Sequence, residues 1–115
     1  MLNISKKTLD RMYVLDAETR STLNIKDVGG LKMATSKCIQ VLNLALVGRN
    51  STHTYNILEP NADEQLDTIL EILKDSRHII VAHNGHGFDF PLIRNLFGVH
   101  IKNAYDSMDI LPPGS

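Results

Sequence analysis

A short apolar run in the second half of the chain places the strongest constraint on the fold. Residues His78–Ala82 read HIIVA, a β-branched run without alternating polar positions. Such a run is typical of a strand that is buried on both faces, as in a parallel crossover unit. Residues 61–77 before it and 90–97 after it carry the apolar spacing of amphipathic helices. A buried strand between two helices predicts an α/β domain.

The two predicted helices carry signals at their ends. Asn61, followed three residues later by Glu64, has the pattern of a capping box at the start of the first helix. Lys74 and Arg77 are expected to close that helix on the side that its dipole favours. Gly98 stands where the second helix is expected to stop. One buried stripe of the first helix is predicted from residues at i, i+3, i+4 and i+7, namely Leu66, Ile69, Leu70 and Leu73.

The first half of the chain predicts three strands. Met12–Glu18 reads as a strand that leads into acidic residues, and Ser21–Lys37 is polar and glycine-interrupted, which indicates a loop with a short helical turn. Cys38–Val47 and Thr52–Leu58 are predicted to pair as an antiparallel hairpin around the turn signal GRNS. With a short strand near the C-terminus, this order predicts one α/β domain over residues 1–115, with a mixed sheet and flanking helices.

Composition narrows the class of protein. The chain has 12 basic and 13 acidic residues, a net charge of -1, which argues against a histone-like role. It leaves a nuclease open, because bound metal ions can supply positive charge locally. The single Cys38 cannot form an intrachain disulfide, so a reducing cytoplasm is expected. No signal peptide and no apolar stretch near the roughly 18 residues of a membrane span are found, so no membrane partner is expected.

A polar joint follows the predicted buried strand. His83 and Asn84 end the strand, Gly85 and Gly87 would let the chain turn sharply, and Asp89 stands where the next helix begins. In open α/β sheets, ligands collect beyond the carboxyl ends of the strands, which favours a functional site here. The alternative is that Asp89 is only the N-cap of its helix.

Two further carboxylates, Asp16 and Glu18, stand two residues apart directly after MYVL. On a strand they would point to the same face, about 6.5 Å apart. Two such charges repel, by about 4 kcal/mol at 4 Å in a protein-like dielectric. A chain that keeps the pair in a sheet protonates one member or binds a cation between them. Alternatively, the strand ends before Asp16 and both side chains are solvated.

Two motifs stand in order along the chain, LDAETRS (residues 15–21) and VAHNGHGFDFPLI (residues 81–93). They resemble the first two motifs of the DEDD-type 3′→5′ exonucleases, which have the ribonuclease H-like fold. The first motif, Asp-x-Glu-Thr, is matched by Asp16, Ala17, Glu18 and Thr19. The second, at a strand-to-helix joint, is matched by Asn84, Phe88 and Asp89. HNGH before the aromatic-Asp pair makes the chain most similar to the exonuclease domain of bacteriophage family A DNA polymerases, with further likeness at Met33-Ala34 and at Tyr105–Leu111.

The resemblance implies hydrolysis of phosphodiester bonds with two Mg²⁺ or Mn²⁺ ions, at the 3′ end of single-stranded DNA or of RNA. Asp16 would bridge both ions, Glu18 would hold one, and Asp89 would hold the other directly or through water. The substrate would lie against a set of neighbouring residues, namely Ala17, Thr19, Asn84, His86 and Phe88. His86 belongs to the second motif, so it is expected to shape the site and not to act as the general base.

The third motif of that family, which carries a fourth carboxylate on a downstream helix, is not found. Tyr105 and Asp109 fit Tyr-x-x-x-Asp, but they follow Asp89 by only 16 to 20 residues and fall where the family has a strand and a helix start. We therefore expect a domain that is incomplete at its C-terminus and weak or inactive alone. Its uncovered face would need a homodimer, a swapped arrangement, a polymerase domain or a missing half. The alternatives are a catalytically silent nucleic-acid- or polymerase-binding module and a regulatory domain with vestigial carboxylates.

Overall fold

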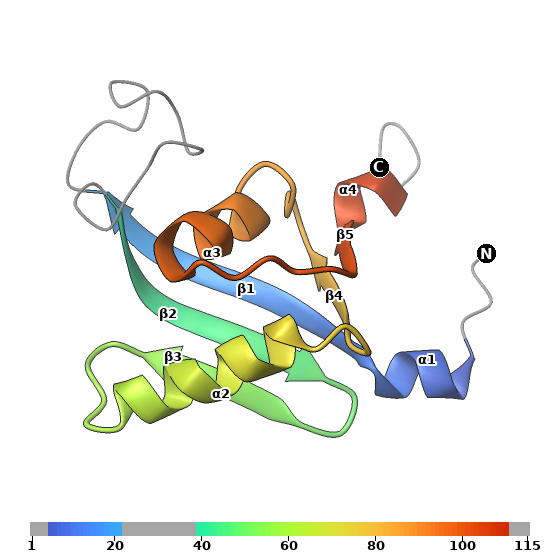
Figure 1. Cartoon of the computed structure of the whole chain (residues 1–115), viewed down its shortest axis with the longest axis horizontal. Helices are drawn as coiled ribbons and strands as arrows, with labels where there is room; N and C mark the ends of the chain where they lie inside the picture. The colour runs from blue at the N-terminus through green and yellow to red at the C-terminus, as the bar shows by residue number, and fades with distance from the viewer. Residues whose placement is uncertain (1–4, 22–38, 111–115) are drawn as a thin grey trace.

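The computed structural model describes residues 5–21 and 39–110, with the side chains of 21 and 110 left aside. These residues form a five-stranded sheet with helices beside it (Figure 1), and the strand order is β3-β2-β1-β4-β5. In chain order the elements are α1 (Lys6–Asp10), β1 (Met12–Ser21), β2 (Ile39–Gly48), β3 (Thr52–Asn56), α2 (Ala62–Lys74), β4 (Ile79–Ala82), α3 (Asp89–Phe97), β5 (Ala104–Asp106) and α4 (Ser107–Ile110).

The sheet is mixed, as predicted. Strand β1 pairs antiparallel with β2, and β2 pairs antiparallel with β3, which confirms the hairpin. On its other side β1 pairs parallel with β4, and β4 pairs parallel with β5. The two helices that connect the parallel strands, α2 and α3, lie on the same face of the sheet (Figure 1). This follows from two right-handed crossovers that advance across the sheet in the same direction.

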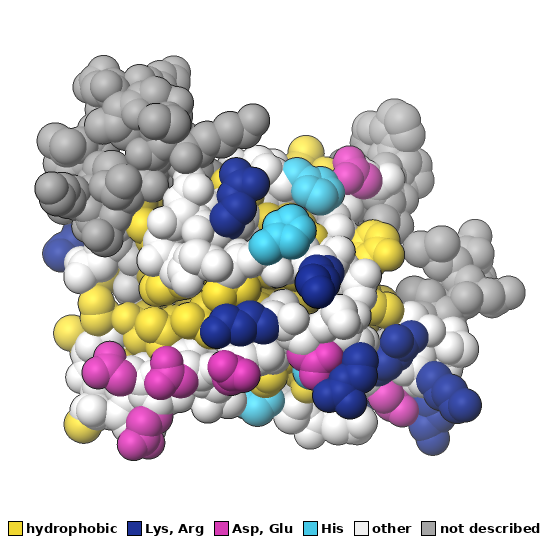
Figure 2. All heavy atoms as spheres, viewed as in Figure 1, with side chains coloured by type: hydrophobic (Ala, Val, Ile, Leu, Met, Phe, Trp, Pro, Cys, Tyr) yellow, Lys and Arg dark blue, Asp and Glu magenta, His cyan; other side chains and the backbone are white. Residues whose placement is uncertain are grey.

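The core lies between the sheet and these two helices. On β1 the burial alternates, because Leu15 faces the helices and is 2% exposed, whereas Val14 is 48% exposed. Figure 2 shows the helical face, where an apolar band separates the acidic side chains over α2 from basic side chains above it. The largest fully buried side chains are all aliphatic: Leu15, Ile39, Leu44, Leu46, Ile69, Leu73, Ile80, Leu92 and Ile93.

The second face of the sheet carries an apolar row. Val47 pairs with Val14, Val14 with Val81, and Val81 with Tyr105, so all four side chains point to one face. Val14, Val47 and Tyr105 are each about half exposed. The prediction that β4 is buried on both faces is therefore wrong: Ile80 and Ala82 are buried but their alternate neighbours are only half buried. The reason is that, in the described ranges, both long helices cover the same side.

The helix ends differ in part from the predicted signals. Asn61 occupies the N-cap of α2, but its side chain makes no capping hydrogen bond, so the predicted capping box is wrong. Its φ of −101° and ψ of 27° lie outside the extended region that a capping side chain needs. Arg77 lies beyond the helix and pairs with Asp75 at 2.7 Å. Gly98 ends α3 in the left-handed conformation, with φ of 68°, as predicted.

Other boundaries are close to the predictions. Strand β1 continues past Glu18 to Ser21, while β3 ends at Asn56, because Asn56 accepts the backbone N–H of Leu58 through its side chain and so starts a turn. The predicted loop with a helical turn, and Cys38, fall almost wholly within residues 22–38, outside the described ranges. None of the described helices has the length and apolar character to span a membrane.

The apolar row on the second face predicts self-association of the chain. Changing Val14→Thr together with Val47→Thr keeps strand-favouring β-branched residues but makes the row more polar. We expect the unchanged chain to form dimers or larger species at micromolar concentration in light scattering, and the double variant to remain near 12.8 kDa. Leu58→Thr, in an exposed side chain outside the row, is the control. A monomeric unchanged chain would contradict the prediction.

Candidate functional site

Asp16 and Glu18 lie on β1 and point to the same face of the sheet, since both alternate with the inward-facing Leu15 and Ala17. Both side chains are exposed, so the prediction that they share one face of a strand is confirmed. They line a hollow of about 270 Å³ together with polar residues of the hairpin, of the turn that follows it and of α2, among them Asn43, Thr54, Asn56, Glu59 and Gln65.

A break in the strand register lies next to Glu18. Glu18 pairs with Asn43 across the sheet, whereas the next residue, Thr19, pairs with Val41, so Leu42 is an extra residue in β2. Such bulges bend the strand and re-aim its side chains. The Asn43 side chain donates a hydrogen bond of 3.3 Å to the Glu18 carboxylate, which orients that carboxylate on the surface.

Asp89 is the first residue of α3 and is 6% exposed. Phe88 occupies the N-cap, so the alternative in which Asp89 is the N-cap is wrong. Strand β4 pairs with β1 only from Met12 to Val14, so the chain that follows β4 lies beside the part of β1 that carries Asp16. The pKa of Asp89 is raised to about 7. The larger cause is burial, and the negative charges of Asp16 and Asp106 add to it.

The polar joint between β4 and α3 is a tight loop whose glycines serve packing. Asn84 takes the left-handed conformation, with φ of 55°, while Gly85 and Gly87 do not. A Cβ at Gly85 would meet the Phe90 ring at 2.5 Å, and a Cβ at Gly87 would meet the Asn84 side-chain oxygen at 2.5 Å. The predicted close approach is therefore present, but it is toward neighbours in the fold, and the sharp turn is made by Asn84.

Asp106, at the end of β5, is a residue of this region that the sequence reasoning missed. Its side chain is 5% exposed and accepts the backbone N–H of His86 at 3.1 Å and that of Met108 at 2.9 Å. Burial by itself would raise the pKa of Asp106, but the backbone N–H groups of Met108, His86, Asn84 and Gly85 outweigh it and lower the pKa. The available signal was an acid at the end of a short strand, in YDSM.

Further contacts tie the 83–88 loop to the same C-terminal segment. The His83 ring makes a 2.9 Å hydrogen bond with the Ser107 hydroxyl, and the His86 ring lies 3.6 Å from the Asp109 carboxylate. Asp109 and Tyr105 are both exposed, on α4 and β5. Asp109 thus lies next to the second motif through its contact with His86.

The remaining predicted site residues are distributed around the carboxylates. Asn84 and His86 are exposed on the loop, and Phe88 is half buried against the core. Ala17 and Thr19 are half buried, and Ala17 packs against the core on the opposite face from Asp16. The structure thus brings together Asp16 and Asp89 and lays the loop beside them, while the substrate-binding roles stay predictions.

The carboxylate oxygens of the site are suitable ligands for a hard divalent cation, but their arrangement does not form a complete metal site. Asp89 is a buried carboxylate in the field of two other carboxylates, a strain that a cation relieves. Among the described residues, however, no group of three or more His, Cys, Asp or Glu side chains is arranged to hold a metal ion. The three-carboxylate centre of Asp16, Glu18 and Asp89 therefore stays a prediction.

The raised pKa of Asp89 predicts that stability depends on pH in metal-free buffer. Between about pH 4 and pH 7 the folded chain holds a proton on Asp89 that the unfolded chain has lost, so the unfolding free energy falls as pH rises. Asp89→Asn cannot ionise, so its stability relative to the unchanged chain should grow by up to about 4 kcal/mol between pH 4 and pH 8. Urea unfolding with EDTA measures this, with Asp67→Asn on α2 as control. Parallel curves for Asp89→Asn and the unchanged chain would rule it out.

The buried hydrogen bonds of Asp106 predict a large cost for its removal. Asp106→Ala leaves buried N–H groups without an acceptor, which should lower the unfolding free energy by about 1–3 kcal/mol. Asp109→Ala, in the neighbouring exposed carboxylate, should cost less than about 0.5 kcal/mol. Urea unfolding at neutral pH compares the two, and equal losses would refute the anchoring role of Asp106.

Comparison with known proteins agrees with this architecture. A family model described as the RNase_H superfamily matches residues 12–114, nearly all of the chain. The match spans both predicted motifs and every described strand. A comparison with curated proteins finds no match. The mixed five-stranded sheet with its flanking helices is the ribonuclease H-like arrangement, and the chain belongs to the RNase H superfamily.

Proposed function

We propose that this chain is a metal-dependent 3′→5′ exonuclease domain of the DEDD type. Its substrate would be the 3′ end of single-stranded DNA, with RNA as the second possibility. The superfamily supports a nuclease-like fold that processes nucleic acid. The order and content of the two motifs support the finer assignment, since Asp16 and Glu18 stand on the first strand and Asp89 at the strand-to-helix joint.

The observation that carries the proposal is the electrostatic position of Asp89. A carboxylate that is 6% exposed and lies in the field of Asp16 and Asp106 costs folding free energy when it ionises. Strongly perturbed carboxylates of this kind cluster at catalytic and metal-binding sites. A purely structural Asp at a helix start needs neither the burial nor the neighbouring charge of Asp16.

RNase H-like nucleases generally use divalent metal ions. Here Asp16 and Asp89 would hold Mg²⁺ or Mn²⁺, with Glu18 as a further ligand after rotation away from Asn43. When bound, two such ions activate the attacking water and stabilise the leaving oxygen. The chain itself would position the substrate. The loop of Asn84 and His86 is held by Asp106 and Ser107, and Phe88 supports the loop from the core.

A second candidate is a catalytically silent nucleic-acid-binding module of the same fold. The observation that favours it is that the described residues contain no ready cluster of three or more metal-ligating side chains. The absence of a clear third motif points the same way. The two candidates differ in turnover and not in binding, so one assay separates them.

The proposal predicts slow, metal-dependent digestion of a single-stranded oligonucleotide from its 3′ end. With Mn²⁺ present, Asp16→Asn and Asp89→Asn should each lower the rate by at least about 100-fold, because each removes a charge on which positioning of the reacting groups depends. A 5′-labelled oligonucleotide, resolved by gel electrophoresis, shows whether products shorten one nucleotide at a time.

Asp67→Asn, an exposed carboxylate on α2, is the matched control and should keep the rate of the unchanged chain. Digestion that survives both site substitutions would indicate a contaminating nuclease. Oligonucleotide binding without any metal-dependent digestion would support the silent module.

A further inference from the structure

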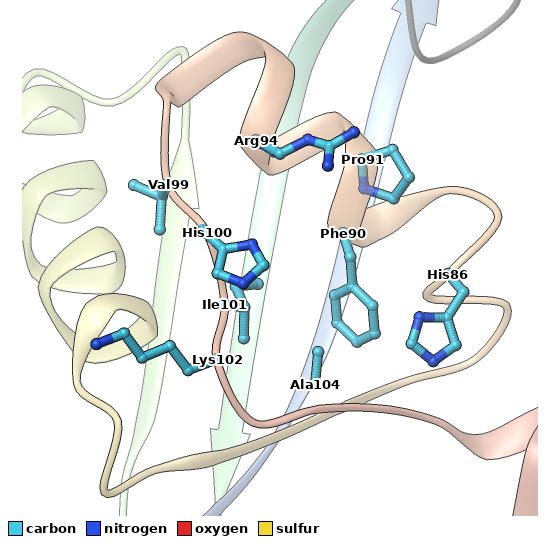
Figure 3. Close-up of a pocket in the computed structure, with 9 residues that line it drawn as sticks. All are labelled: His86, Phe90, Pro91, Arg94, Val99, His100, Ile101, Lys102 and Ala104. Atoms are coloured by element: carbon cyan, nitrogen blue, oxygen red, sulfur yellow. The ribbon is translucent and has the colours of Figure 1, made fainter.

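A second hollow lies away from the carboxylates. It has a volume of about 410 Å³ and opens between α3 and the segment that leads to β5 (Figure 3). Only one of the predicted site residues, His86, belongs to its wall. Its wall includes His86, Phe90, Arg94, His100 and Lys102, with the buried Val99 and Ile101.

The polar part of this wall is entirely basic. Arg94, His100 and Lys102 are exposed, and Figure 3 shows the His100 ring between the other two side chains. None of the three forms an ion pair with a described residue. The fourth basic residue of the wall, His86, lies 3.6 Å from the Asp109 carboxylate. No Asp or Glu is among the described residues of the wall, although the chain as a whole has a net charge of -1.

A wall that carries Arg94 and Lys102 without a described ion-pair partner attracts an anion. Arg and Lys with nothing acidic in the wall are suited to a phosphate group, since the guanidinium offers a fork of donors and the ammonium a point charge. Figure 2 shows a row of acidic side chains over α2 and basic side chains beyond the apolar band above it, while α2 itself also carries Lys74, which pairs with Glu71. The hollow is thus a local positive site on an almost neutral protein.

The floor of the hollow is apolar. Val99 is 3% exposed and Ile101 is 6% exposed, so both belong to the core. The Phe90 ring packs edge-on against the His86 ring, with centroids 5.4 Å apart, and Figure 3 shows it between the two histidines. An aromatic and apolar floor beside cations suits a nucleotide, whose base can stack while its phosphate is held.

The hollow and the candidate site share helix α3 and the loop before it. Phe90 directly follows Asp89 in the first turn of α3, and the N–H of Phe90 donates to Gly85 in the loop at 2.8 Å. His86 is fixed by the hydrogen bond from its N–H to Asp106. A strand bound in the hollow would therefore be held against the same loop and helix that carry Asp89.

We propose that this hollow binds backbone phosphates and a base of single-stranded nucleic acid, outside the carboxylate site. Figure 3 shows the charged ends of Arg94 and Lys102 pointing away from each other, with His100 between the two side chains, so each contacts its own phosphate of the strand, while Phe90 and His100 contact the base. The choice of nucleic acid as the ligand rests on the proposed function. The binding itself requires no metal ion and no catalysis.

The test measures binding of a fluorescein-labelled single-stranded oligonucleotide to the full chain by anisotropy, in EDTA and at several salt concentrations. Arg94→Ala with Lys102→Ala should weaken binding about tenfold or more at low salt and reduce the slope of log affinity against log salt by about 1–2. Lys6→Ala with Lys7→Ala removes the same charge from exposed positions on α1 and should change affinity less than about twofold. Lys102→Arg, which keeps the charge, should retain binding.

Equal weakening by the two double variants would overturn the proposal, because it would show binding by net charge alone. Binding that is indifferent to Arg94 and Lys102 would overturn it as well. Inorganic phosphate is tested as a competitor: saturation of the hollow by phosphate without any oligonucleotide binding would show an anion site that is not for nucleic acid, which overturns the assigned ligand. Circular dichroism melting of each variant establishes that it is folded.

The Asp16→Asn variant distinguishes a failure of this proposal from a failure of the proposed exonuclease function. The variant should lose digestion in Mn²⁺ yet keep oligonucleotide binding in EDTA with its dependence on Arg94 and Lys102. A chain that binds in this way but never digests would refute the exonuclease and leave the hollow intact. If the chain digests the oligonucleotide but its binding does not depend on Arg94 and Lys102, only the proposed role of the hollow is refuted.

Discussion

The buried carboxylate of Asp106 organises the functional end of this molecule. It accepts backbone N–H groups from both sides, from His86 in the loop after β4 and from Met108 in α4. An acceptor with a full charge makes these bonds stronger than neutral ones. The loop that carries Asn84 and His86 is thereby fixed to β5, the last strand of the sheet. Because α3 begins directly after this loop, the position of the helix start is fixed as well.

The two buried carboxylates, Asp106 and Asp89, have pKa values that are shifted in opposite directions. Asp106 is stabilised as an anion by backbone N–H groups, which lower its pKa in spite of burial. Asp89 is raised to a pKa of about 7 by burial and by the charges of Asp16 and Asp106. Asp106 therefore does two things: it holds the loop in place, and it contributes to the electrostatic strain on Asp89. That combination suits a site whose charge is completed by a bound cation.

A hollow lined by carboxylates and a hollow lined by basic side chains lie in different parts of this small domain. The carboxylates Asp16 and Glu18 face the hollow over the hairpin, whereas the hollow beside α3 is basic. Asp89, which lies in the field of Asp16, is followed by Phe90 of the basic hollow in the first turn of α3. The start of one helix therefore positions both a carboxylate of the first region and a ring of the second.

Local patterns were sufficient for the α/β class, the antiparallel hairpin, the stop of α3 at Gly98 and the shared face of Asp16 and Glu18, because alternation and helical spacing are properties of neighbouring residues. The capping of α2 could not be read from Asn61, since its backbone angles depend on the turn before it. The half-buried neighbours in β4 depend on which face the helices cover. The role of Asp106 and the basic hollow arise from residues that the sheet brings together across the chain, so only the tertiary structure decided them. By itself, the sequence determined which residues could do chemistry; packing decided which of them meet, because burial and charge proximity are properties of three-dimensional contact.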